Sequence, residues 1–281
     1  MHPHKHSTID VLIPTCNRAY ALAVTLASLL GQTWHSLRVV ISDQSDRDDV
    51  FDTPEVAAVL RVLRATGRQV ETHRHLPRRG MAEQRAFLLA QATAARCLFL
   101  DDDVILENDA IARMAEMLEF EQCGFVGSAL HGLSFLDDIR PEQQIIEFWE
   151  DPVEPESVTP GGPEWERHHL HSAANLFHLQ ARLGLTKADT RLYKVAWVGG
   201  CVLFDTEKLR EAGGFDFWSE LPHEHCGEDV LAQLRVMARH GGCAIIPSGA
   251  YHMELPTTVT TREIDAPMIL KVGAAFSTEA S

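Results

Sequence analysis

Residues 97–103 read CLFLDDD, an apolar run that passes directly into three adjacent aspartates. Consecutive apolar residues of this kind are typical of a strand that is buried on both faces of a sheet. Three neighbouring carboxylates repel one another, so a folded chain tolerates them best in solvent or around a cation. The stretch therefore predicts a buried strand that ends either in a metal site or in an acidic turn before a helix.

The sequence around this strand alternates between strand-like and helix-like segments. Short β-branched or apolar runs predict strands, and apolar residues at helical spacing predict helices. The expected strands are 9–13, 38–42, 70–73 and 97–100, and the expected helices are 19–32, 53–66, 81–95 and 107–121. This alternation predicts an α/β fold, with a mainly parallel sheet flanked by helices on both faces.

Polar residues follow three of these strands, at the point where each strand ends. They are Thr15, Asp43 and the run from Asp101 to Asp103. Ligands of open α/β sheets bind beyond the carboxyl ends of the strands. Three strands therefore deliver polar groups to one edge of the sheet, which is the first indication of function.

The second half of the chain is less regular. Residues 148–162 are acidic and proline-rich, which predicts an exposed loop. Residues 168–178 are dense in histidine without the spacing of a structural zinc site, which predicts a mobile loop with solvated histidines. The ordered segments expected beyond it are a strand pair or glycine-broken strand at 194–204, a helix at 206–212, a helix at 228–240 and a strand at 243–247.

Composition limits the partners and the cellular location. The net charge of −15 argues against a nucleic acid as the main partner. Six cysteines are scattered without a pairing rhythm, which suits free thiols in a reducing compartment. The start of the sequence lacks the architecture of a signal peptide, and no apolar run approaches the length of a membrane span. We therefore expect a soluble, cytoplasmic protein, with peripheral contact at the inner membrane face left open.

Several short motifs follow one another in a set order along residues 8–255. They are VLIPTCNR (11–18), SLLGQT (28–33), SDQS (42–45), Gly80 with Arg85, LDDD (100–103), Gly199-Gly200, GGFD (213–216), Glu228-Asp229 and His252. In this order they resemble the family 2 glycosyltransferases, which have the Rossmann-like GT-A fold. Each motif alone is weak, and the ordered set is specific. Residues 130–190 match nothing specific.

The resemblance implies a binding site for a nucleotide-sugar donor. Its residues in this chain would be Pro14, Thr15, Cys16, Asn17, Arg18, Asp43, Gly80, Arg85, Asp101 and Asp102. Asp43 would recognise the base or the ribose, and Arg85 would contact the diphosphate. Cys16 departs from the family, because an aromatic residue often contacts the base at that position.

The resemblance also implies a metal site and a catalytic base. Mn²⁺ or Mg²⁺ would be bound by Asp103, with Asp101 and His252 assisting, since both cations prefer oxygen ligands. Asp229 would act as the general base, and Glu228 would orient the acceptor.

The acceptor side is implied less directly. Gly199 and Gly200 resemble a family phrase on that side. Among the tryptophans, we expect Trp218 to contact the acceptor and Trp197 to pack in the core.

The expected function is that of a metal-dependent glycosyltransferase. It would move a sugar from a nucleotide-diphosphate donor, with UDP favoured, to the hydroxyl of a saccharide, lipid-linked or small-molecule acceptor, with inversion. Residues 1–125 would form the nucleotide-sugar-binding half of one GT-A domain, 126–256 the acceptor-binding and catalytic half, and 257–281 a C-terminal tail that is ordered in part at most. The sugar, the base, the acceptor and the oligomeric state stay open.

Two alternatives carry different expectations. A nucleotidyltransferase would have a glycine- and lysine-rich phosphate loop near the first strand, where this chain reads PTCNRAY. A non-catalytic nucleotide-sugar-binding protein would most readily have lost the acidic motif or Asp229, and both are present. The transferase therefore stands first.

Overall fold

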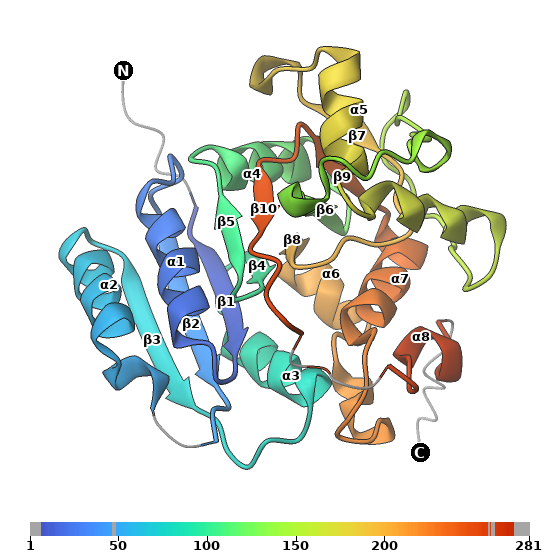
Figure 1. Ribbon diagram of the computed structural model, residues 1–281. Coiled ribbons are helices and arrows are strands. Elements are labelled where there is room, and N and C mark those ends of the chain that lie inside the picture. Colours follow the sequence, from blue (N-terminus) through green and yellow to red (C-terminus); the bar gives the residue numbers. More distant parts are fainter. Residues whose placement is uncertain (1–6, 47–48, 258, 260–261, 273–281) are drawn as a thin grey trace.

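The structure is a computed structural model that describes residues 7–46, 49–257, 259 and 262–272. Within these residues the chain forms one eight-stranded sheet and one small two-stranded sheet (Figure 1). The order of strands in the large sheet is β3 (Gln69–Arg74), β2 (Leu37–Asp43), β1 (Ile9–Thr15), β4 (Arg96–Leu100), β8 (Cys201–Asp205), β6 (Phe125–Gly127), β9 (Gly242–Ile246) and β7 (Arg191–Tyr193). The first four strands are parallel, and β8 runs antiparallel to both β4 and β6. The predicted α/β fold with a mainly parallel sheet is confirmed.

Helices cover both faces of this sheet (Figure 1). They are α1 (Ala19–Leu30), α2 (Pro54–Ala65), α3 (Met81–Gln91), α4 (Ala110–Glu121), α5 (Asn175–Leu183), α6 (Thr206–Glu211), α7 (Glu228–His240) and α8 (Ala266–Ile269). The side chains of β1 alternate between two cores, because successive residues of a strand face opposite ways. Val11 and Ile13 pack with α1, α2 and α4, whereas Leu12 packs with α3 and α7. Burial on both faces explains the continuous apolar run of this strand.

The predicted helix at 107–121 begins later than expected, at Ala110. The three residues before the predicted helix, Val104–Leu106, form β5, which pairs antiparallel with β10 (Ala250–His252). In this register His252 lies opposite Val104, directly after the three aspartates. The small sheet therefore brings a distant histidine to the acidic end of β4.

The predicted helix at 81–95 ends early, at Gln91. The Asp10 carboxylate accepts hydrogen bonds from the backbone N–H groups of Thr93 and Ala94, at 2.6 and 2.8 Å. These bonds fix the turn that leads into β4.

The middle of the chain is more ordered than the sequence predicts. In the segment 148–162, expected as an exposed loop, Val153 and Val158 are buried. Residues 168–178 lie largely in a 3₁₀ segment (Pro163–His171) and the start of α5, so the prediction of a loop is wrong, and the four histidines of the segment are half-buried. His171 shares a 2.9 Å hydrogen bond with the Tyr193 hydroxyl, and burial lowers the pKa of His171 to about 4. Apolar side chains between the polar ones anchor this segment to the core.

The segment 194–204, predicted as strand, is strand only in part. β7 ends at Tyr193 and β8 begins at Cys201, so residues 194–200 form a connection between them.

None of the described helices combines the length and the apolar character that a membrane crossing requires.

Candidate functional site

A cavity of about 420 Å³ opens at the carboxyl edge of the parallel strands. Its walls come from the ends of β1 and β4, from the first turns of α3 and α7, and from β10 with the chain that follows it. The predicted site residues that line it are Pro14, Thr15, Cys16, Arg18, Arg85, Asp101, Asp102, Asp103, Glu228, Asp229 and His252. The fold therefore gathers most of the predicted site into one space.

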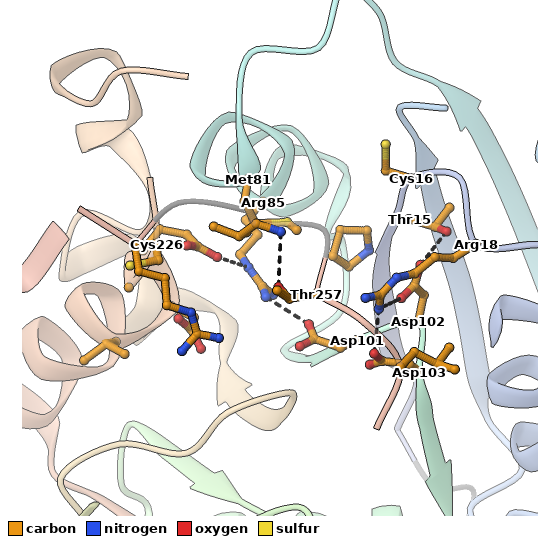
Figure 2. A pocket seen from close by; sticks show the side chains of 18 of the residues that line it. Thr15, Cys16, Arg18, Met81, Arg85, Asp101, Asp102, Asp103, Cys226 and Thr257 are labelled. Carbon is orange, nitrogen blue, oxygen red and sulfur yellow. Dashed lines mark hydrogen bonds and ion pairs between the residues drawn. The ribbon is translucent and has the colours of Figure 1, made fainter. Parts of the chain in front are cut away.

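The acidic end of β4 is buried rather than solvated. Asp102 is 6% exposed and Asp103 is 5% exposed. The Thr15 hydroxyl donates to Asp102 at 2.6 Å, and Arg18 Nη1 donates to Asp103 at 2.5 Å and to Asp102 at 3.3 Å. Figure 2 shows Arg18 beside both aspartates. A guanidinium thus neutralises the aspartates, where the sequence predicted either exposure to solvent or a bound cation.

The pKa values of Asp102 and Asp103 are shifted in opposite directions. Burial raises the pKa of Asp102 to about 7, although the hydrogen bond from Thr15 opposes that rise. Burial acts in the same direction on Asp103, but His252 and Arg18 hold the pKa of its carboxyl below the usual range. Asp103 therefore loses its proton at a lower pH than Asp102 does.

The donor set at this point fits a hard divalent cation. His252 Nε2 lies 3.4 Å from Asp103 Oδ2, so a carboxylate and an imidazole are adjacent in the cavity wall. The described residues contain no cluster of three or more histidine, cysteine, aspartate or glutamate side chains arranged around a metal position. Mg²⁺ is typically bound by one or two carboxylates together with substrate phosphates, so two protein ligands suffice. In this structure the Arg18 guanidinium contacts both aspartates and neutralises part of their charge.

Arg85 bridges two elements across the cavity (Figure 2). Its Nε donates to Glu228 at 2.9 Å, and its Nη2 donates to Asp101 at 2.9 Å. Arg85 and Glu228 are both about 5% exposed. Despite burial, the charges of Asp101 and Glu228 hold the pKa of Arg85 above its ordinary value. The guanidinium that the sequence assigned to the diphosphate is thus engaged by protein carboxylates.

The first turn of α7 places Asp229 in the cavity. Gly227 precedes the helix with a φ of +73°, and a Cβ there would lie 2.0 Å from Asp265 Oδ1. Only glycine fits that turn. Burial and the neighbouring Glu228 raise the pKa of Asp229 to about 7, against the lowering effect of Arg85. The side chain is therefore a carboxyl that changes charge near neutral pH.

Other predicted residues lie outside this cavity. The buried Asp43 carboxylate accepts from Ser45, through its backbone N–H at 2.8 Å and its hydroxyl at 2.5 Å. Asn17 lines a neighbouring cavity of about 480 Å³, and Gly80 lines another of about 370 Å³. Both of these cavities share Cys16 with the main one. They extend the site along the edge of the sheet.

Fewer of the residues predicted on the acceptor side line the main cavity. Gly199 and Gly200 do not line the main cavity, although the Gly200 carbonyl accepts from the Asp101 N–H at 2.9 Å. Trp218 and Trp197 both pack against the core, and Trp197 also lines the main cavity, which Trp218 does not. The core position expected for Trp197 is therefore confirmed, and the acceptor contact expected for Trp218 stays a prediction.

Sequence reasoning missed a group of cavity residues in the C-terminal part of the chain. They are Leu255, Thr257, Val259, Arg262 and Asp265. The Cys226 N–H donates to the Ile264 carbonyl at 2.9 Å, and the Ala266 N–H donates to the Cys226 carbonyl at 2.9 Å. These two hydrogen bonds hold the predicted tail against the start of α7. No local sequence pattern predicts them. Residues 258, 260–261 and 273–281 of that tail lie outside the described residues.

Comparison with solved structures places the fold among glycosyltransferases. The structure of S. aureus TarS 1-349 in complex with UDP-GlcNAc is 15% identical, with a TM-score of 0.58 over 90% of this chain and 60% of that chain. A structure of S. aureus TarS is 17% identical, with a TM-score of 0.54 over 87% of this chain and 36% of that chain. This chain therefore spans well under two thirds of TarS. The likeness identifies the fold as GT-A, as the sequence predicted.

Mannosyltransferase PcManGT from Pyrobaculum calidifontis, in complex with GDP-Man and Mn²⁺, is 17% identical over 84% of this chain and 56% of that chain, with a TM-score of 0.46. No curated protein matches the chain. The family model of glycosyl transferase family 2 matches residues 10–178, which is more than half of the sequence. That match includes all of β1 except its first residue, the acidic end of β4 and Arg85. The chain belongs to glycosyl transferase family 2.

Proposed function

We propose that the protein transfers a sugar from a nucleotide-diphosphate donor, with UDP favoured, to an acceptor hydroxyl. The observation that carries the proposal is the meeting of Asp103, Arg85 and Asp229 in one cavity. A buried anion, a paired guanidinium and a carboxyl of raised pKa are the groups that this chemistry needs. Membership of the family supports the same reaction.

The leaving group is a nucleoside diphosphate, and its charge must be stabilised as the bond to the sugar breaks. Asp103 and His252 would hold Mn²⁺ or Mg²⁺ there, with Asp101 assisting, and that cation would supply Lewis-acid stabilisation of the diphosphate. Arg18 would leave the aspartates and contact the phosphates by charge-assisted hydrogen bonds. The loop after β1 and the buried Asp43 would bind the nucleoside.

Asp229 would remove the proton of the acceptor hydroxyl. As the acceptor oxygen bonds to the anomeric carbon, the bond from that carbon to the diphosphate oxygen breaks and its electron pair leaves with the diphosphate. The hydroxyl proton passes to the Asp229 carboxylate. A pKa near the working pH suits a general base. Attack opposite the leaving group inverts the anomeric configuration.

Glu228 and Arg85 would prepare this step. The Arg85 guanidinium holds Glu228 in one orientation beside Asp229. A fixed carboxylate there would orient the acceptor by hydrogen bonding, which lowers the entropic cost of reaching the reactive geometry.

We also propose that the enzyme acts in the cytoplasm. All six cysteines are free thiols in the structure, which supports a reducing compartment.

The test is calorimetry with UDP, GDP, dTDP and CDP, each with and without Mn²⁺. We expect one nucleotide to bind with a Kd that improves at least about tenfold with Mn²⁺, and we expect Asp103→Ala to remove that gain. Asp137→Ala, a change of an aspartate that does not line the cavity, serves as the control. Absence of binding for every nucleotide under both conditions would overturn the proposal. NMR of the product then reports the anomeric configuration, and retention would exclude the proposed role of Asp229.

A further inference from the structure

Trp197 lies in the wall of the cavity, and the residue that follows it, Val198, is hydrogen-bonded to α7. The Gln233 side chain accepts from the Val198 N–H at 2.8 Å and donates to the Val198 carbonyl at 2.8 Å. The same Gln233 amide lies 3.2 Å from the Asp229 carbonyl. One buried side chain therefore fixes the backbone next to Trp197 relative to the turn that carries Asp229.

The indole of Trp197 also packs against two rings of the 3₁₀ segment Pro163–His171. The centroid of the Trp165 ring lies 4.4 Å from that of the indole, with an interplanar angle of 43°. The His168 ring stacks on the indole with a centroid separation of 5.0 Å and an interplanar angle of 12°. His168 is itself held by a 2.7 Å hydrogen bond between Nδ1 and the Trp165 carbonyl. A rigid aromatic group in a cavity wall offers contact area without an entropic cost of ordering.

The charge near Trp197 restricts the molecule that it can contact. The cavity is lined by three guanidinium groups and six carboxylates, the latter being Asp101, Asp102, Asp103, Glu228, Asp229 and Asp265. Two of the guanidiniums, those of Arg18 and Arg85, are already paired with these carboxylates. The third, that of Arg262, interacts electrostatically with Asp265, where it opposes the rise that burial causes in the pKa of that carboxyl. A phosphorylated acceptor beside Glu228 and Asp229 would meet like charge, whereas a neutral ring would not.

We propose that Trp197 is the platform for the acceptor and that the acceptor is an uncharged saccharide ring. The C–H groups on the apolar face of a pyranose carry a small positive charge and pack on the negative face of an indole. A ring held this way would direct a hydroxyl at the neighbouring Asp229. The inference rests on the proposed function and adds the class of acceptor and the residue that selects it.

The test measures acceptor binding separately from donor binding. Saturation-transfer NMR, with the nucleotide identified by calorimetry present, would examine the methyl pyranosides of glucose, galactose, mannose and N-acetylglucosamine, with glycerol 3-phosphate as the charged comparison. We expect at least one methyl pyranoside to bind and glycerol 3-phosphate not to bind. Trp197→Ala should weaken that binding by about tenfold or more, Trp197→Phe should retain most of it, and the nucleotide Kd should stay within about twofold.

Trp218→Phe is the matched control, because Trp218 packs on the core without lining the cavity. Absence of binding for every methyl pyranoside, a preference for glycerol 3-phosphate, or unchanged binding in Trp197→Ala would each overturn the inference while nucleotide binding persists. Loss of nucleotide binding in Trp197→Ala would also overturn it, because the ring would then serve the donor. If Trp197→Ala does not fold, Trp197→Leu carries the test. Failure of the wild-type protein to bind any nucleotide would instead overturn the proposed function.

Discussion

Arg85 Nε donates to Glu228 Oε1 at 2.9 Å, and this bond joins α3 to the first turn of α7. A second bond from the same guanidinium reaches Asp101 at the end of β4. Three elements that are distant in the sequence thus meet at one buried cation. The strength of this junction depends on all three charges, since each is costly to bury alone.

Removal of the Arg85 guanidinium should therefore destabilise the fold as well as the site. In Arg85→Gln, Glu228 and Asp101 lose their positive partner, and we expect the free energy of unfolding to fall by about 3–5 kcal/mol. Urea denaturation measures the change. The control is Arg96→Gln, because Arg96 pairs with the exposed Glu119 and should contribute about 0–1 kcal/mol. Equal effects of the two substitutions would contradict the role of Arg85 as a junction.

Gly80, at the start of α3, is the second feature on which the geometry of the site depends. Its φ is +102°, and a Cβ there would lie 2.6 Å from the His223 carbonyl oxygen and 2.7 Å from His225 Cε1. Gly67 has a φ of +87° with no atom within 4 Å of a Cβ, so it isolates the backbone strain. We expect Gly67→Ala to lower stability by about 1 kcal/mol and Gly80→Ala to lower it by roughly 1–3 kcal/mol more.

Thermal or urea unfolding of both glycine variants decides this point. Because Gly80 lines the cavity that adjoins the main one, Gly80→Ala should also weaken nucleotide binding, whereas Gly67→Ala should leave it unchanged. If Gly80→Ala were as stable as Gly67→Ala, the segment around His223 would move away from the added Cβ without lowering the free energy of unfolding.

The fold was predictable where its elements carry local patterns. The strands near Thr15, Asp43 and Asp101 are short apolar runs, and α7 begins at Glu228 and ends at His240 as the helical spacing predicts. β5 was missed because its three residues gain strand geometry only by pairing with β10, far along the chain.

The site was predictable where its residues form motifs, and unpredictable where tertiary contacts decide. The three aspartates, Glu228 and Asp229 meet in the cavity as the motif order implied. Trp197 resembled a core residue, because its neighbours are apolar and the Pro163–His171 segment that orients it shows no periodicity. Asp265 reaches the cavity only through the bridge to Cys226.

His171 should make the stability of the protein depend on pH. Its pKa falls from 6.5 to about 4, chiefly through burial, with further lowering by the charges of His168 and His131, and a hydrogen bond that the ring donates to the Trp197 backbone opposes this fall. The folded pKa lies below the unfolded one, so this contribution is complete above pH 6.5 and is lost as the pH falls toward 4. We expect a loss of roughly 2 kcal/mol over that range.

Urea unfolding at a series of pH values would measure the effect of His171. His171→Gln, which keeps a polar partner for the Tyr193 hydroxyl, should flatten the pH dependence. The control His35→Gln alters an exposed histidine and should not. An unchanged slope in His171→Gln would show that other groups cause the acid sensitivity.

Asp229 should set the pH dependence of catalysis. Burial and Glu228 raise its pKa to about 7, and a general base acts only when it is deprotonated. As the pH falls below about 7, kcat/KM should therefore fall by about tenfold per pH unit. Asp229→Asn should lower kcat by about 10²–10⁴-fold at every pH, with nucleotide affinity retained. Asp216→Asn, which changes an exposed carboxylate outside the cavity, should keep both the rate and the profile of the wild type. A wild-type profile that stays flat from pH 5 to 8 would remove Asp229 as the base, because no group of raised pKa would then control the proton transfer.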